Sequence, residues 1–372
     1  MASSQANSTV RQMQEQLHTK AYQSGTTFKL AVGYHYLTIL FGTWLICGVF
    51  IDGYAHNHGV VETFFTPWHA ILYSGFLVCT IWMSYLVYRT RRITGLSWRL
   101  AIPNGYGLGL TGAAVFLTGG LCDMAWHIIY GIEQDVAALL SPSHLMLLVG
   151  GIMILSSPFR SAWNEEDDAP GWRSFAPPLL SVTLTLSVIS FFLMYAWMFR
   201  YNLASQPVTD WYLTKFYSGH IQQANEMRGL SYLLLNTMQY MIPLLLLIRR
   251  WRLPFGAVTV LFTFVTVLMN ALDGFDNAIT IVFAFAAGLV GDLAYRWLKP
   301  DEGNRLWAMR VFVLLVPAML WTLYFGWLKA TDGIGWEIEV WTGAIVSAAL
   351  ASLALSLLAF PPRRPERRQE GA

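Results

Sequence analysis

Side chains that can bind a metal ion occur twice in this sequence at nearly the same spacing. Each set has one Asp and two His residues: Asp52, His56 and His69 in the first, and Asp123, His127 and His144 in the second. Imidazole together with carboxylate suits copper, zinc or iron. Three protein ligands also leave a coordination position open, as in catalytic rather than closed structural sites. The pattern therefore predicts at least one metal centre.

The spacing predicts how each set is assembled. Asp and His four residues apart share one face of a helix, here at the end of an apolar segment. Thr66 and Ser141 are favourable helix N-caps, each followed by Pro, which suits the first helical position. His69 and His144 then fall in the first turn of the returning helix. We expect each helical hairpin to direct one carboxylate and two imidazoles at a single point.

A bound metal ion would also relieve two unfavourable interactions with helix dipoles. Asp52 and Asp123 are expected at helix C-termini, where the helix dipole disfavours an anion, and His69 and His144 at N-termini, where it disfavours a protonated imidazole. A divalent cation relieves the first problem and binds the neutral imidazole that the second prefers. The alternative is that each hairpin is a hydrogen-bonded scaffold without metal.

The two sets belong to a longer internal repeat. Glu follows Asp by ten residues in both, at Glu62 and Glu133, and both continue with Thr/Ser-Pro-x-His-x-x-Leu-x-x-Gly. The second copy has four extra residues between its Glu and its Pro. Glu62 and Glu133 are candidates for further ligands, for groups that orient a His, or for catalytic proton carriers. We expect a parallel repeat about an axis along the membrane normal, with repeat 1 at 30–88 and repeat 2 at 106–158.

Composition places these sets in a membrane protein. The 372 residues are 55% hydrophobic and 12% charged, too apolar for an ordinary soluble domain. Spans of about 20 apolar residues should be helical, because every backbone group must be hydrogen-bonded internally. The sequence predicts an all-α, polytopic membrane helical bundle of about ten transmembrane helices: 30–51, 66–88, 106–128, 141–158, 177–199, 229–248, 254–272, 277–295, 307–328 and 340–360.

The basic residues predict an orientation. With ten spans, 20 of the 24 Lys and Arg residues fall on one side, and the exceptions are Arg200, Lys215, Arg228 and Lys329. The positive-inside rule then makes residues 1–29 and 361–372 cytoplasmic tails and places both metal sets on the extracytoplasmic face. Residues 30–158 form the duplicated hairpins and 159–360 the remaining membrane helices. No phosphate-binding glycine loop occurs, and we expect no nucleic-acid partner.

Other polar residues carry weaker signals. His58 has Ile129 as its counterpart in the second copy, which favours a surface or supporting role. His35 lies almost six helical turns from His56 and is interpreted as a buried, hydrogen-bonded residue. Asp273 and Asp276 occur in an acidic turn, and His220 in a long connection from Tyr201 to Met227 that is a candidate lid or re-entrant element; the sequence leaves the roles of these three open.

The motif residues resemble a known family. The Asp-x3-His-x12-His spacing of Asp52, His56 and His69, together with Thr66-Pro-x-His69 and Ser141-Pro-Ser-His144, is similar to the C subunit of the copper membrane monooxygenases that oxidise methane or ammonia. The similarity covers about 25 residues in each copy. The second copy departs from it, with sixteen rather than twelve residues between its two His.

The resemblance implies copper at the first set and, through the repeat, at the second. It also implies a copper-dependent oxidoreductase that uses dioxygen, a small or lipophilic substrate reached among membrane lipids, and partner subunits or a homo-oligomer. The residues themselves leave three functions open: this oxidation, hydrolysis by zinc, and the handling or transport of metal ions. A purely structural role for the hairpins is a fourth interpretation.

Overall fold

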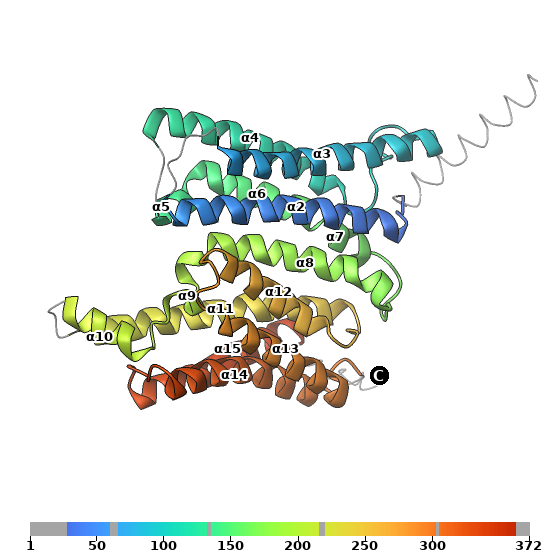
Figure 1. Ribbon diagram of the computed structural model, residues 1–372. Helices are drawn as coiled ribbons and strands as arrows, with labels where there is room; N and C mark the ends of the chain where they lie inside the picture. Colours follow the sequence, from blue (N-terminus) through green and yellow to red (C-terminus); the bar gives the residue numbers. More distant parts are fainter. Residues whose placement is uncertain (1–27, 60–65, 132–134, 216–219, 303–304, 362–372) are drawn as a thin grey trace, which may run out of the picture. The chain divides into compact units, whose positions relative to one another are not determined.

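The computed structural model describes residues 28–59, 66–131, 135–215, 220–302 and 305–361, and throughout these residues the protein is helical, without a β-strand (Figure 1). Glu62 and Glu133 lie outside the described residues. The predicted all-α, polytopic membrane fold is confirmed.

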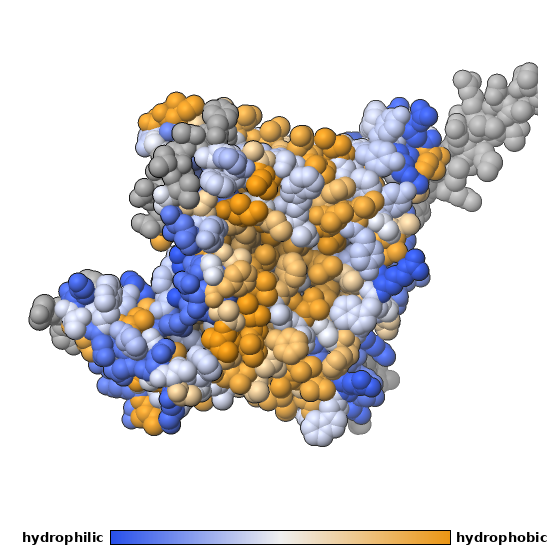
Figure 2. Space-filling model, in the orientation of Figure 1, coloured by the Kyte–Doolittle hydropathy of each residue, from blue (hydrophilic) through white to orange (hydrophobic). Residues whose placement is uncertain are grey.

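Among the residues that the structure describes, eight helices are long and apolar enough to cross a membrane. They are α2 (Val32–Asn57), α3 (Pro67–Thr94), α4 (Gly107–Tyr130), α8 (Trp172–Phe192), α11 (Ile221–Arg250), α13 (Ile279–Leu298), α14 (Leu306–Ala330) and α15 (Ile338–Ala359). On the face shown in Figure 2, hydrophobic residues cover mainly the middle of the helices and hydrophilic residues gather towards their ends.

The two remaining predicted spans differ from a simple membrane helix. The fourth is a pair, α6 (Pro142–Leu155) and α7 (Ser157–Trp163), bent by 43° where Pro158 begins the second helix. The seventh, α12 (Ala257–Ala271), has only 15 residues. The connection from Tyr201 to Met227 contains a further helix, α10 (Gln206–Lys215), and the first turns of α11, with His220 at the N-cap of α11. Short elements α5 (Asp135–Leu140), η1 (Met194–Ala196) and α9 (Met198–Tyr201) complete the fold.

The helices form two compact units. Unit 1 comprises Met1–Glu166 and Trp172–Ile189, and unit 2 comprises Asp167–Gly171 and Ser190–Ala372. Unit 1 contains both hairpins that carry the Asp/His/His sets. Its helices α2 and α3 pack as one pair, and α4 and α6 as another.

Glycine brings the two helices of each hairpin into backbone contact. In the first hairpin, a Cβ atom added at Gly48 would lie 2.5 Å from the Cα of Leu72, and one at Gly75 would lie 2.7 Å from the Cα of Leu45. Only glycine lets backbones approach this closely, as in other membrane helix pairs. The close approach brings the C-terminal end of α2 next to the N-terminal end of α3.

The second hairpin uses glycines at the corresponding positions. A Cβ at Gly119, which is 71 residues after Gly48, would lie 3.1 Å from the backbone nitrogen of Leu147. A Cβ at Gly150 would lie 2.7 Å from the backbone nitrogen of Phe116. Leu147 and Phe116 are themselves the counterparts of Leu72 and Leu45. The two hairpins are therefore packed through matching contacts.

In unit 2, a buried side chain bonds the irregular backbone that follows α8. The predicted span 177–199 stops as a regular helix at Phe192, so the predicted boundary at 199 is wrong. Asn236 of α11 is fully buried, accepts a hydrogen bond from the backbone N–H of Met198 at 2.8 Å and donates one to the carbonyl oxygen of Ala196 at 3.1 Å. These bonds replace helical ones, which allows an irregular backbone inside the protein.

Asp292 has a comparable structural role. Its side chain on α13 accepts hydrogen bonds from the backbone N–H groups of Val258 and Thr259, at 3.1 and 2.9 Å. The hydroxyl group of Thr259 donates a further bond at 2.6 Å. Asp292 thus caps the first turn of α12, whose own N-cap, Gly256, has no side chain that could do so.

Two adjacent glycines test the packing of the second hairpin. We expect Gly150→Ala to force α4 and α6 apart at a cost of about 1–3 kcal/mol, typical of an overpacked core. Gly151→Ala meets no atom within 4 Å and should be neutral or stabilising by about 0.5–1 kcal/mol, because alanine favours a helix interior. The apparent Tm of detergent-purified protein measures both; an equal decrease in the two variants would contradict the assignment.

Candidate metal centres

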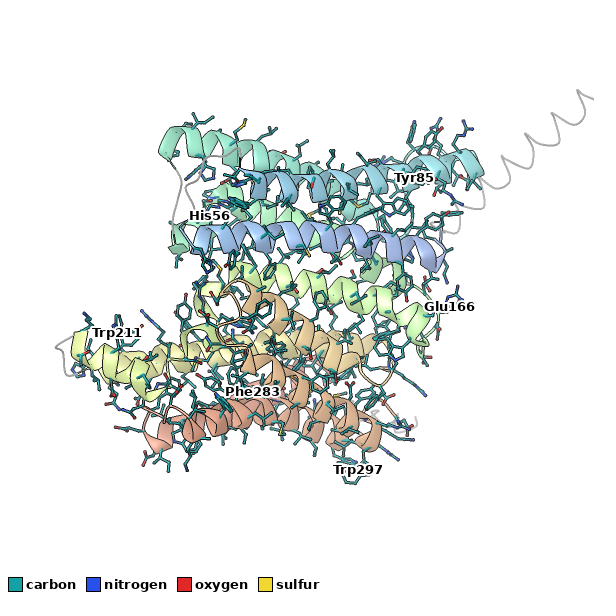
Figure 3. The ribbon with its side chains drawn as sticks, viewed as in Figure 1. His56, Tyr85, Glu166, Trp211, Phe283 and Trp297 are labelled. Carbon is teal, nitrogen blue, oxygen red and sulfur yellow. The ribbon has the colours of Figure 1, made fainter. Side chains whose placement is uncertain are left out.

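The six predicted ligands form two clusters in unit 1. Group 1 is Asp52, His56 and His69, and group 2 is Asp123, His127 and His144. In each group one ligand atom from each residue lies within 4.8 Å of the others. The Asp and first His come from the last turns of α2 or α4, and the second His from the first turn of α3 or α6. The ends of these helices meet at one end of unit 1, where His56 is labelled in Figure 3.

In group 1 the carboxylate lies between the two imidazoles. His56 Nε2 is 3.7 Å from Asp52 Oδ2, and His69 Nδ1 is 3.5 Å from Asp52 Oδ1. The two imidazole rings are nearly perpendicular, at 84°, with their centroids 6.0 Å apart. Each carboxylate oxygen therefore faces a different imidazole.

Group 2 has almost the same arrangement and is tighter. His127 Nε2 and His144 Nε2 lie 3.4 Å from Asp123 Oδ2 and Oδ1, respectively. The ring centroids are 6.1 Å apart at 69°. The Asp123 side chain is only 1% exposed, compared with 13% for Asp52. A carboxylate this deeply buried requires a compensating positive charge.

The helix caps also hold the second His of each group. The Thr66 hydroxyl oxygen accepts the backbone N–H of His69 and lies 2.8 Å from its Nδ1. Ser141 does the same for His144, with 2.6 Å to Nδ1. The predicted N-caps and the Pro residues that follow them are confirmed. In group 2 this contact is at Nδ1 while Nε2 faces Asp123, the arrangement usual for metal-binding His. In group 1 the same nitrogen, His69 Nδ1, both contacts Thr66 and faces Asp52.

Group 2 has two supporting contacts that the sequence analysis missed. The Ser143 hydroxyl group donates a hydrogen bond to Asp123 Oδ1 at 3.1 Å. His127 Nδ1 faces the carbonyl oxygen of Gly131 at 3.4 Å. The corresponding residue to Ser143 in the first copy is Trp68. This difference between the motifs Ser-Pro-Ser-His and Thr-Pro-Trp-His was the available signal that the two groups are not equivalent.

The two groups are close to one another. Helices α3 and α4 pack together, and His56 lies near enough to His127, His144 and Asp123 for their charges to interact with its own. Charge placed on one group therefore affects the other.

The other polar residues that the sequence singled out have contacts outside groups 1 and 2. His58 stacks on Tyr54, and its Nδ1 contacts the Tyr54 carbonyl oxygen at 2.8 Å. His35 Nδ1 lies 2.9 Å from the hydroxyl oxygen of Tyr106. In unit 2, Asp273 forms an ion pair with Arg200 at 3.1 Å, which gives this acidic turn a structural role. Asp276 lies in the same turn.

Neither models of known protein families, nor curated protein sequences, nor solved structures match this chain.

Ser141 offers a test of how its hydroxyl group supports group 2. Ser141→Ala removes the hydroxyl group that contacts His144 Nδ1, so it should weaken metal binding at group 2 by roughly ten- to a hundredfold, the usual effect of removing such a support. Ser141→Thr keeps the oxygen and should bind like the parent. Competition between protein and chelator for Co²⁺ measures the affinities. Equal affinities in the two variants would show that the Ser141 contact does not orient His144.

Proposed function

We propose that this protein is an integral membrane metalloprotein in which groups 1 and 2 bind metal ions. Copper is the first choice, with zinc and iron as alternatives. We further propose that the metal serves the oxygen-dependent oxidation of a small or lipophilic substrate. The metal site is supported by the geometry of the two groups, and the reaction by the resemblance of their motifs to the copper membrane monooxygenases.

The separations between ligand atoms carry the proposal. The four carboxylate–imidazole distances are 3.7 and 3.5 Å in group 1 and 3.4 Å twice in group 2. Hydrogen bonds from an imidazole N–H to a carboxylate are shorter, at about 2.7–3.2 Å. Ligands at about 2.0–2.2 Å from a tetrahedral metal lie about 3.3–3.6 Å from one another. Three of the four distances fall within this range, and the fourth, between His56 and Asp52, lies just above it. The spacing therefore supports a shared cation at each group.

Electrostatics supports the same assignment. Asp52 and Asp123 lie near the C-terminal ends of α2 and α4, where the helix dipole is unfavourable to a carboxylate. The cation that compensates Asp123 is either a proton on an imidazole or a metal. His144 lies in the first turn of α6, where the positive end of the helix dipole opposes protonation, whereas His127 lies in the last turn of α4, where the dipole favours it. A metal ion satisfies both residues at once.

The chain's own residues define what the centre can do. Two imidazoles and one carboxylate bind the ion, Thr66 and Ser141 orient the second imidazole of each group, and a position remains for a further ligand. Copper bound there would supply one-electron redox chemistry. Glu62 and Glu133 stay predictions as catalytic proton carriers, because they lie outside the described residues.

Transport of the metal across the membrane is less well supported. A conducting path needs polar side chains that are available through the bilayer. The four candidates in the sequence have structural contacts. His35 contacts Tyr106, and Asn236 bonds the backbone of η1 and α9. Asp292 caps α12, and Asn270 donates to Thr266 and Thr280. Hydrolysis is the alternative reaction if the metal is zinc, since zinc activates a bound water.

We also propose that the two hairpins are copies of one ancestral unit and that both termini are cytoplasmic, with the centres on the extracytoplasmic face. The matching glycine contacts support the first proposal, and the distribution of Lys and Arg supports the second. Partner subunits or a homo-oligomer are part of the proposal through the resemblance alone.

The first experiment is elemental analysis of detergent-purified protein by plasma mass spectrometry. We expect metal in the parent and its loss in the double variant His69→Ala/His144→Ala, because each substitution removes one of three ligands. His69→Ala alone should remove one metal if the groups act separately and disturb both if they share ligands. If the bound metal is copper, the next assays test oxidation. If it is zinc, they test hydrolysis.

His58→Ala is the matched control. His58 belongs to the same helix end but to neither group, and its contacts are to Tyr54. Metal content should therefore stay at the parental level. Equal metal content in the parent and in the double variant would refute the ligand assignment, and a parent that binds no metal after reconstitution would identify the hairpins as scaffolds.

A further inference from the structure

Tyr73 has contacts near both Asp/His/His groups. It lies one helical turn beyond His69 on α3, at a spacing that puts the two side chains on the same face. Their rings are nearly parallel, at 16°, with centroids 6.4 Å apart. Tyr73 therefore extends the face of α3 that contributes His69 to group 1.

The hydroxyl end of Tyr73 reaches the helix that carries group 2. A Cβ atom added at Gly120 of α4 would lie 2.9 Å from the Tyr73 hydroxyl oxygen and 2.8 Å from its ring. Gly120, Asp123 and His127 are three and four residues apart, so they share one face of α4. The phenol thus lies against the α4 face that holds Asp123, and the charges of both Asp52 and Asp123 act on it.

This contact is not part of the internal repeat. The counterpart of Tyr73 in the second copy is Leu148, and the counterpart of Gly120 in the first copy is Val49. The glycines that pack the hairpins, by contrast, occur in both copies. Gly120 therefore accommodates a tyrosine that the second copy lacks at the corresponding position.

Aromatic residues also hold the Tyr73 ring. Phe76 and Phe116 stack with centroids 4.7 Å apart, and Tyr73 meets the edge of Phe116, with centroids 6.5 Å apart. Together with His69 and Gly120, these contacts fix the phenol beside the faces of α3 and α4 that carry groups 1 and 2.

We propose that Tyr73 is a catalytic residue of this centre, and that its hydroxyl group donates a hydrogen bond to a small anionic or oxygen-containing ligand bound at the metal groups. The inference rests on the proposed function, because the ligand is held by the metal. It adds a binding partner for the ligand that comes from neither Asp/His/His group.

Azide is a suitable probe because it is a small anion that binds metal centres at open positions. Full-length, copper-reconstituted protein would be titrated with azide, with the charge-transfer absorption of the complex as the signal. We expect Tyr73→Phe to weaken azide binding by about ten- to a hundredfold, the effect of losing a hydrogen bond to a charged partner. Its copper content should equal that of the parent, because no metal ligand is changed.

Tyr85→Phe provides the control on the same helix. Tyr85 is 46% exposed and lies towards the other end of α3, away from His56 (Figure 3). This variant should bind azide like the parent. Equal azide affinity in Tyr73→Phe and Tyr85→Phe, with full copper content in both, would overturn the role of Tyr73 while leaving the metal site intact. A parent that binds no copper would instead remove the proposed function, and the inference with it.

A double-mutant cycle tests the position of Tyr73 without metal. Gly120→Ala should lower the apparent Tm of the full-length protein, because its methyl group would overlap the Tyr73 ring. In a Tyr73→Ala background the same substitution should lower the apparent Tm only slightly, because the aromatic ring is absent. An equal decrease of Tm in both backgrounds would show that the phenol does not lie against Gly120, and would overturn the proposal.

Discussion

The close approach of two helices in each hairpin is the constraint on which the metal groups depend. Asp and the first His come from one helix and the second His from another, so their separation is set by the distance between the helix axes. Glycine at Gly48 and Gly75, and again at Gly119 and Gly150, lets the backbones touch. A membrane lacks the hydrophobic force that drives helices together in water, so such close packing is a principal source of association. The geometry of the site is thus a property of residues that carry no functional group.

Much of the fold and of the two groups could be predicted from short-range features of the sequence. The fold class follows from composition, and the grouping of each Asp with its His follows from helical periodicity. The caps Thr66 and Ser141 follow from the preference of hydroxyl side chains for N-termini, and Ser141 holds its imidazole as well as its helix. Each of these inferences needs only a few neighbouring residues, and the internal repeat doubled the signal for each.

The contacts that could not be predicted join residues far apart in the chain and occur only once. Tyr73 meets Gly120, Asn236 bonds the backbone of η1 and α9, and Asp292 caps α12. Nothing in the sequence after Phe192 indicates an irregular backbone, because the side chain that bonds Ala196 and Met198 belongs to α11. A lone Asn or Asp in an apolar segment raises the expectation of function, and here two of them complete the backbone of another helix.

The cap on α12 has a consequence for the surrounding lipid. With 15 residues, α12 is about 22 Å long, whereas the hydrocarbon core is about 30 Å thick. A helix that stops short of the headgroups leaves backbone N–H groups in a region without water, at a cost of several kcal/mol for each group. Asp292 bonds two such groups in the first turn of α12 from a neighbouring helix, so this turn does not depend on water or headgroups for those two hydrogen bonds. An isolated helix of the same length would depend on them.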